Sequence, residues 1–267
     1  MIYAKVIADS VTGNGSRLTT MEVRMHRFVL AEFNTHRIFS RNSASSRAIP
    51  IAKQIAMIEK NPAIPLEWGS NKSGMQAGEP LFGKNARKAK RAWKKACKNA
   101  VKSCRALESL GVHKQIANRV LEPFMWHTVI VSSTEWDSFF EQRCSELAQP
   151  EIRHVALAMK SAYKKSVPDF IVSGEYHLPY LHPEDYLLPV EVKIKISAAR
   201  CARVSYLTHD NKKSLIKDIE LFNRLVSANP PHWSPMEHIA TPLTSTLDGS
   251  GNFSGFAQLR HNLDLIF

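Results

Sequence analysis

Apolar and polar side chains alternate near the N-terminus, in residues 2–9 and 18–33, on either side of the polar segment TGNGSR. A period of two residues around such a turn predicts a β-hairpin with a long, partly buried second strand. The segment HTVIVSST, residues 127–134, is rich in β-branched side chains and predicts a further strand. Residues 190–206, VEVKIKISAARCARVSY, begin with the same alternation, and we expect a strand there as well.

Helical patterns occupy most of the remaining chain. We predict helices near residues 50–60, 84–110, 112–121, 134–143, 150–164 and 212–228, with Pro150 in a first helical turn. Residues 61–83 and 166–190 are rich in proline and other turn-forming residues and predict surface connections. No internal repeat is present, so we expect one mixed α+β domain over residues 1–267, with residues 60–110 as a helical lobe.

The predicted helix near 84–110 is strongly basic. Ten Lys or Arg and no Asp or Glu lie between Lys84 and Arg105. Apolar residues recur on it at steps of three and four, up to a stop at Gly111. Such a charge run is typical of a solvated face on a packed helix, although it also suits phosphate groups. No zinc-finger, RNP or recognition-helix pattern accompanies it, so the sequence argues against a nucleic-acid partner.

Composition argues against a disordered chain, a membrane or secreted protein, and a disulfide-bonded one. The chain has 36 Lys and Arg against 24 Asp and Glu, and 44% hydrophobic residues, which is typical of a globular protein and not of a disordered one. No run of about 20 apolar residues and no secretory signal pattern is present, so we expect no membrane span. The four cysteines form no CxxC pair, and we predict a reduced, cytoplasmic protein.

The densest polar cluster is THRIFSRNSASSRA, residues 35–48, directly after the predicted hairpin. Arginine forks match two phosphate oxygens at once, and closely spaced serines add hydroxyl and backbone donors. An anion site and a solvated polar turn remain equally open for this cluster. A second cluster, HWSPMEH at residues 232–238, lacks the HExxH spacing of a zinc helix, so we expect no metal. Its Ser-Pro step instead predicts a helix start with Ser234 as the cap.

A covalent nucleophile is not indicated. The sequence has no GxSxG elbow and no Cys/His motif, and it has neither a Walker A loop nor a GxGxxG turn. Cys144 lies beside Arg143, but nothing else supports a reactive thiolate there, and we interpret it as structural.

Four segments together resemble the flavin-dependent thymidylate synthase family. The family signature is RHR, two residues, S, one residue, N, two residues, S, one residue, R, and residues 35–47 match it at six positions: His36, Arg37, Ser40, Asn42, Ser45 and Arg47. The segments AARCARVSY, HWSPMEH and RCSELAQPEIR resemble three further family motifs. In typical members the first two of these precede the signature, whereas here they follow it, so the chain resembles a circular permutation, which nearby surface termini allow.

The resemblance implies an α+β fold with a mostly antiparallel sheet flanked by helices, and a homotetramer with shared sites. It implies FAD as cofactor, with His36, Arg37, Ser205, His232, Ser234 and Glu237 as the flavin-side residues. Ser45, Ser46, Arg47, Arg119 and Arg143 would bind the nucleotide. Arg143 would also be catalytic, by stabilising negative charge that develops on the uracil ring.

The implied reaction transfers a one-carbon unit from 5,10-methylenetetrahydrofolate to C5 of dUMP, giving dTMP, with NADPH reducing the flavin. Several positions depart from the family pattern: Thr35 replaces the first Arg of RHR, Ser43 replaces a Glu, Ser46 replaces a Gly, SSTEW replaces an N-x-R segment, and Leu147 replaces a His. These departures keep open a relative that hydroxymethylates dUMP or dCMP. The basic helix at residues 84–105 keeps open a second alternative, a nucleic-acid-binding protein without catalysis.

Overall fold

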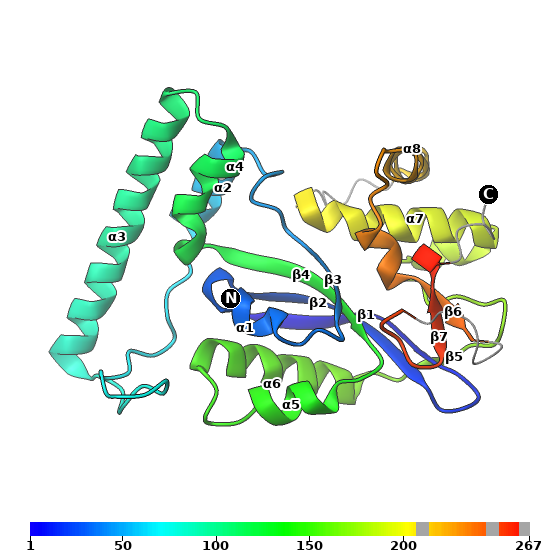
Figure 1. The fold of residues 1–267 in the computed structure, drawn as a ribbon, viewed down its shortest axis with the longest axis horizontal. Coiled ribbons are helices and arrows are strands. Elements are labelled where there is room, and N and C mark those ends of the chain that lie inside the picture. Colours follow the sequence, from blue (N-terminus) through cyan, green and yellow to red (C-terminus); the bar gives the residue numbers. More distant parts are fainter. Residues whose placement is uncertain (207–213, 244–250, 262–267) are drawn as a thin grey trace.

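A five-stranded sheet forms the centre of the computed structural model, which describes residues 1–206, 214–243 and 251–261. Its strands are β1 (Tyr3–Val11), β2 (Arg17–His26), β3 (Ser40–Ser43), β4 (Trp126–Ser133) and β5 (Asp169–Phe170), in the order β3-β4-β2-β1-β5. All neighbours are antiparallel except β1 and β5. The mixed α+β class, with its mostly antiparallel sheet, is confirmed (Figure 1).

One face of the sheet is apolar and lies against two helices, α5 (Asp137–Arg143) and α6 (Pro150–Lys165). Met21, Val23 and Met25 alternate along β2 and pack there with Val129 and Val131 of β4. The period of two in the sequence therefore reports a genuine buried face. The strand predicted to reach residue 33 ends at His26, because the chain turns there into η1 (Arg27–Val29) and α1 (Leu30–Asn34).

The opposite face of the sheet is covered by α7 (Val190–Arg203), which continues into η4 (Val204–Tyr206). Here the strand predicted for residues 190–206 is wrong. The alternation stops at Ile196, and the run Ala198, Ala199, Ala202 favours a helix that packs closely. Pro189 precedes the helix, Glu191 lies in its first turn and Arg203 in its last, as the helix dipole prefers.

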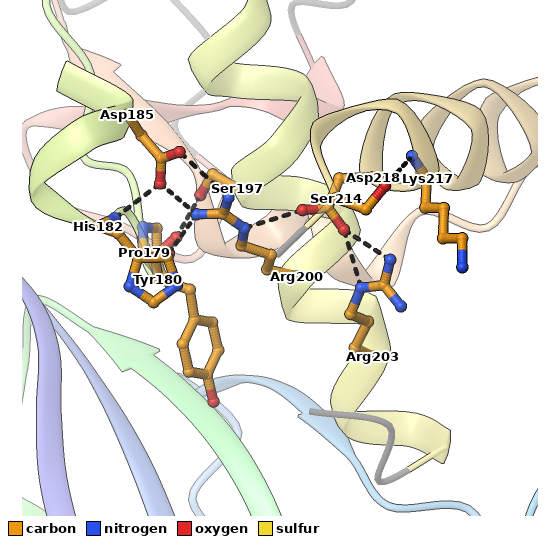
Figure 2. Close-up of polar contacts among 10 residues, drawn as sticks. All are labelled: Pro179, Tyr180, His182, Asp185, Ser197, Arg200, Arg203, Ser214, Lys217 and Asp218. Atoms are coloured by element: carbon orange, nitrogen blue, oxygen red, sulfur yellow. Dashed lines mark hydrogen bonds and ion pairs between the residues drawn. The ribbon is translucent and has the colours of Figure 1, made fainter. Parts of the chain in front are cut away.

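A buried ion network fixes α7 to its neighbours (Figure 2). Arg200 binds Asp185 of η3 (Pro183–Leu187) and donates from Nε to Asp218 of α8 (Leu215–Val226) at 3.0 Å. Arg203 donates to the same Asp218 carboxylate at 2.6 and 2.9 Å. Burial is the largest single influence and raises the pKa of Asp185, but the hydrogen bonds from Arg200 and the His182 N–H, together with the Arg200 charge, lower it overall. The charges are thus paired, as buried charges must be.

Helix α3 (Gly83–Ser109) occupies much of residues 60–110, the range predicted as a helical lobe. It shares one apolar cluster with α2 (Ile51–Lys60), α4 (Lys114–Ala117) and η2 (Asn118–Phe124), which flank that range. The predicted helix near 112–121 is therefore two short elements, and Pro123 lies in the second. Residues 61–82 form a surface connection, pinned by the bridge between Gly69 and Pro80.

The C-terminal part lies beside β3 and β4. It consists of α8, η5 (Ser234–His238), β6 (Ala240–Pro242), β7 (Phe256–Gln258) and η6 (Leu259–His261), and β6 pairs with β7. The predicted helix near 212–228 begins at Leu215 within the described residues, while positions 212 and 213 lie outside them. In the described part of the chain, no helix combines the length and apolarity that a bilayer crossing requires.

A chain of hydroxyl and imidazole groups crosses the second face of the sheet. Ser10 Oγ lies 2.9 Å from His177 Nδ1, and His177 Nε2 lies 2.7 Å from Thr20 Oγ1. Thr20 Oγ1 also lies 2.6 Å from Ser132 Oγ, and Ser132 Oγ lies 2.8 Å from His238 Nδ1. All five side chains are buried. The chain joins β1, β2 and β4 to residue 177 and to η5.

These buried histidines predict a pH-dependent stability. Burial lowers the pKa of His127, His177 and His238 to about 3. The unfolded chain protonates its histidines below about pH 6.5, so it binds more protons than the folded chain between those values, and the unfolding free energy falls as pH falls. Urea unfolding between pH 8 and 5 should show a loss approaching about 4 kcal/mol per pH unit below pH 6. A constant unfolding free energy over that range would contradict the buried, neutral state.

Candidate active site around strand β3

Strand β3 is a short edge strand that carries the centre of the 35–47 cluster. It pairs with β4, with Ser40 opposite Ser132 and Asn42 opposite Ile130. Ser40 and Asn42 are buried on one side, while Arg41 and Ser43 alternate with them and are half-buried. The alternation of a strand therefore divides the cluster into two sets of side chains.

The buried side of β3 binds the segment AARCARVSY. Asn42 Nδ2 donates to the Cys201 carbonyl at 2.8 Å, and Ser205 Oγ donates to Asn42 Oδ1 at 3.1 Å. The Ser45 backbone N–H donates to the Ser205 carbonyl at 3.0 Å. Two motif segments about 160 residues apart in sequence are thus in direct contact.

The same side of β3 also binds the segment HWSPMEH. Gln258 Nε2 donates to Ser40 Oγ at 2.7 Å and to the Glu237 carbonyl at 2.9 Å. The Glu237 carboxylate forms an ion pair with Arg260. Burial lowers the pKa of Arg41, and the nearby Glu237 carboxylate opposes that shift. Glu237 therefore lies within electrostatic reach of the signature cluster.

Arg143 and His36 meet at the other end of the cluster. Arg143 Nε donates to His36 Nε2 at 2.9 Å, and Arg143 Nη2 donates to Thr35 Oγ1 at 2.9 Å and to the Glu32 carbonyl at 3.3 Å. Burial, then Arg143 and Arg41, lower the pKa of His36. His36 is consequently held neutral, with Nε2 as the acceptor and the proton on Nδ1. Its ring packs edge-on against Phe139 of α5.

A further polar cluster surrounds Glu122. Its Oε1 atom accepts from Arg27 at 3.1 Å, from Arg119 at 2.7 Å and from Ser46 Oγ at 3.4 Å. The other Arg27 nitrogen, Nη1, lies 2.9 Å from His127 Nδ1. Burial lowers the pKa of Arg27, with Glu122 opposing it. One carboxylate thus faces two guanidinium groups, which leaves an excess of positive charge beside Ser46.

Sequence reasoning missed Arg27 and Glu122. Arg27 directly follows β2 and lies outside every motif, and Glu122 lies in a turn-rich segment without a pattern of its own. The only available signal was Glu122 three residues after Arg119, a spacing that brings side chains together on a helix.

The other predicted residues lie on the open surface around β3. Arg37, Arg47, His232 and Ser234 are exposed, and Ser205 is half-buried. Within the described ranges, Arg47 is tied to the cluster through its backbone N–H, which donates to Ser45 Oγ at 3.3 Å. The His232 N–H donates to the Leu225 carbonyl, and no described hydrogen bond joins His232 or Ser234 to β3. Ser234 is not the helix cap as predicted: Trp233 occupies that position and offers no side-chain acceptor.

Three cavities in the described structure lie away from these residues. One of about 680 Å³ lies between the 65–80 connection and residues 146–153, next to the fourth motif. The others, of about 660 and 370 Å³, lie along β1 and at the β1–β2 turn. The signature residues line none of these three cavities.

Among the described residues, the cysteines and acidic side chains form neither a reactive thiolate nor a metal site. All four cysteines are free, and burial raises the pKa of Cys97, Cys104, Cys144 and Cys201, so each is held as a thiol. Among the described residues, no group of three or more His, Cys, Asp or Glu side chains has the geometry of a metal site.

Comparisons with known proteins give one family. The model of the family described as thymidylate synthase complementing protein matches residues 18–169. No curated protein matches the chain. A solved structure of a UMP/dUMP methylase, PolB from Streptomyces cacaoi bound with 5-Br dUMP, is similar with 15% identity and a TM-score of 0.46, over 62% of this chain and 91% of that chain. The family match covers more than half of the sequence and includes both the signature cluster and Arg143. The chain belongs to the thymidylate synthase complementing protein family.

Proposed function

We propose that this protein transfers a one-carbon unit from 5,10-methylenetetrahydrofolate to C5 of dUMP, giving dTMP. Family membership supports a transferase of nucleotide biosynthesis. The observation that carries the proposal is the contact of β3 with two distant motif segments, through Asn42, Ser205 and Gln258. We also propose that residues 1–267 act as one domain, because the site draws on both ends of the chain.

The residues around β3 fit a flavin. FAD carries two phosphates and a planar ring, and near β3 the chain offers the exposed Arg37 guanidinium, the neutral His36 ring and the half-buried Ser205 hydroxyl. Glu237, Ser234 and His232 would hold the same group from the C-terminal side. When bound, FAD supplies hydride transfer between NADPH and the one-carbon unit. The chain's own residues bind and orient the group.

The substrate phosphate fits the turn after β3. Ser45, Ser46 and Arg47 present hydroxyl, backbone and guanidinium donors there. Arg119 and Arg27 bring two further cations to the Ser46 hydroxyl through their shared carboxylate, Glu122. Clustered cations and hydroxyls bind a dianionic phosphate through charge-assisted hydrogen bonds.

Arg143 is positioned for the reacting base. Its Nε and Nη2 atoms are held by His36 and Thr35, while its Nη1 atom donates to no described residue. A guanidinium fixed in this way offers its remaining donors to a uracil carbonyl oxygen. Negative charge that develops on the ring during attack at C5 would strengthen this hydrogen bond, so the group stabilises the transition state.

The open face around β3 suits an assembly. Exposed Arg37, Arg47 and His232 leave room for a second subunit to enclose the nucleotide and the flavin. We therefore propose a homotetramer with shared sites, acting in the cytoplasm.

Hydroxymethylation of dUMP or dCMP is the second candidate. One contact favours it: Thr35, which replaces an Arg of the family signature, accepts a hydrogen bond from Arg143 at 2.9 Å. A neutral group next to Arg143 changes the charge around the base and the flavin. Mass analysis of the product from dUMP and dCMP, with and without NADPH, distinguishes a methyl from a hydroxymethyl group.

Replacing Arg143 tests the proposed reaction. We expect Arg143→Ala to lower kcat at least about 100-fold, because one transition-state donor is worth roughly 3 kcal/mol. Flavin absorbance of the purified variant should stay near that of the unchanged protein. Arg143→Lys, which keeps the charge but loses the fork, should retain part of the activity. Unchanged turnover in Arg143→Ala, measured as dTMP formation, would refute the catalytic role, and loss of all flavin would refute the separation of the two sites.

Replacing Glu122 tests the phosphate position. Glu122→Gln keeps the acceptor for Ser46 but removes a negative charge near the proposed phosphate. We expect the KM for dUMP to fall about three- to tenfold, because a charge several Å away contributes about 1 kcal/mol in a solvated site. Inhibition by inorganic phosphate should strengthen in parallel. The matched control is Glu135→Gln, an exposed carboxylate after β4. A raised KM in Glu122→Gln would instead place this carboxylate in contact with the substrate.

A further inference from the structure

Helix α3 carries most of the net positive charge of the chain. Ten Lys and Arg residues and one carboxylate, Glu108, lie within Gly83–Ser109, so it holds nine of the twelve net charges. All ten cationic side chains are exposed. Within the described structure, Arg105 alone among them has an ion-pair partner, Glu59 at 2.8 Å. Nine of the ten cations of α3 therefore have no ion-pair partner among the described residues.

Seven of these cations form one continuous row. They follow each other at alternating steps of four and three residues: Lys84, Lys88, Arg91, Lys95, Lys98, Lys102 and Arg105. Residues at such steps share one face of a helix, and the row is about 30 Å long at 1.5 Å per residue. Arg87 and Lys94 lie beside the row. An exposed helix face is kept soluble by charges of either sign, so solvation alone does not account for a row of cations only.

The apolar face of α3 is already occupied. Cys97, Val101 and Cys104 are buried against α2, α4 and η2. In Figure 1, α3 stands at the edge of the molecule, with these elements between it and the sheet. Because a helix that binds a membrane surface must insert its apolar face, this packing excludes α3 from that role. The face that remains open is the cationic one.

The charges on α3 act against the helix itself. Its first turn contains no acidic residue, and its N-cap position, Phe82, provides no side-chain hydrogen bond. Lys84, Arg87 and Lys88 therefore face the positive end of the helix dipole, which favours anions. Like charges four residues apart, as in Lys84 and Lys88, also destabilise a helix. A polyanion along this face would relieve both effects.

We propose that the cationic row of α3 binds the phosphate backbone of nucleic acid. The row matches one turn of a DNA duplex, which is about 34–36 Å long. A second copy of this chain does not fit, because a symmetric contact would place two rows of the same charge against each other. The sequence lacks a motif that reads bases, so the expected binding is independent of base sequence. The inference does not depend on the proposed enzymatic reaction.

Salt-dependent binding to a labelled duplex of random sequence tests the proposal. If about six phosphates are neutralised, log K against log salt has a slope of about −5, and affinity falls about 1,000-fold between 50 and 200 mM salt. The variant Lys88→Gln, Arg91→Gln, Lys95→Gln, Lys98→Gln should bind at least about 30-fold more weakly, with a slope reduced by about 3 to 4. Hydrogen exchange within residues 83–109 should slow when duplex is added to the unchanged protein.

The matched control removes four exposed lysines elsewhere: Lys5, Lys164, Lys165 and Lys217, each changed to Gln. It has the same net charge as the α3 variant and should keep the affinity and slope of the unchanged protein. Circular dichroism and thermal unfolding verify that both variants are folded. Equal losses in the two variants would show that total charge, and not α3, attracts the duplex. That result would overturn the proposal, as would binding to anionic vesicles without binding to the duplex.

Discussion

The hydrogen bonds of Asn42 are the contact on which the rest of the site depends. This buried amide uses its donor for the Cys201 carbonyl and its acceptor for the Ser205 hydroxyl, so it joins β3 to the end of α7 in both directions. An apolar residue in its place would leave a buried carbonyl unpaired, which costs about 1–3 kcal/mol. The position of Ser45 follows from the same contact, since its N–H bonds to Ser205. The turn after β3, which is the proposed phosphate site, is thus positioned by a residue that need not touch a ligand.

A second constraint lies beneath this contact. The face of the sheet toward α7 carries apolar residues such as Ile130 together with hydroxyl groups that bond to His177 and His238. These directed hydrogen bonds favour one register between the sheet and the C-terminal segments, although the buried His238 Nε2 atom has no partner among the described residues. The ion pairs of Arg200 and Arg203 with Asp218 then fix α8 on α7. These polar contacts and the apolar cluster shared by α7, α8, η5 and η6 together position the C-terminal motifs beside β3.

Much of this arrangement follows from the sequence. The period of two in β2 and β4 reports the apolar face of the sheet, and the proline at position 150 correctly marks the start of α6. The alternation at residues 190–196 led to a wrong prediction of a strand. Four apolar residues at even spacing also occur on a helix that is buried on several sides, as here. Alternation alone does not distinguish a strand from such a helix; the length of the segment and its alanine content are also needed.

Some residues of the candidate site could be predicted from the sequence, and others could not. The signature residues are recognisable because they share a short segment, and the structure places His36 in hydrogen-bond contact with Arg143. Arg27 and Glu122 could not be found, since their roles arise from tertiary contacts between η1, η2 and the turn after β3. No local sequence pattern indicates that Arg27 or Ser46 contacts Glu122. The circular order of the motifs is physically harmless for the same reason: β3 gathers them in space.

The central claim is that segments from the two ends of the chain form one ligand site. Hydrogen–deuterium exchange, with and without dUMP and FAD, tests this most directly. The account predicts slower exchange in residues 42–48 and, in the same sample, in residues 200–206 and 234–238. Protection confined to the first of these segments, with the C-terminal segments unchanged at saturating ligand, would contradict it.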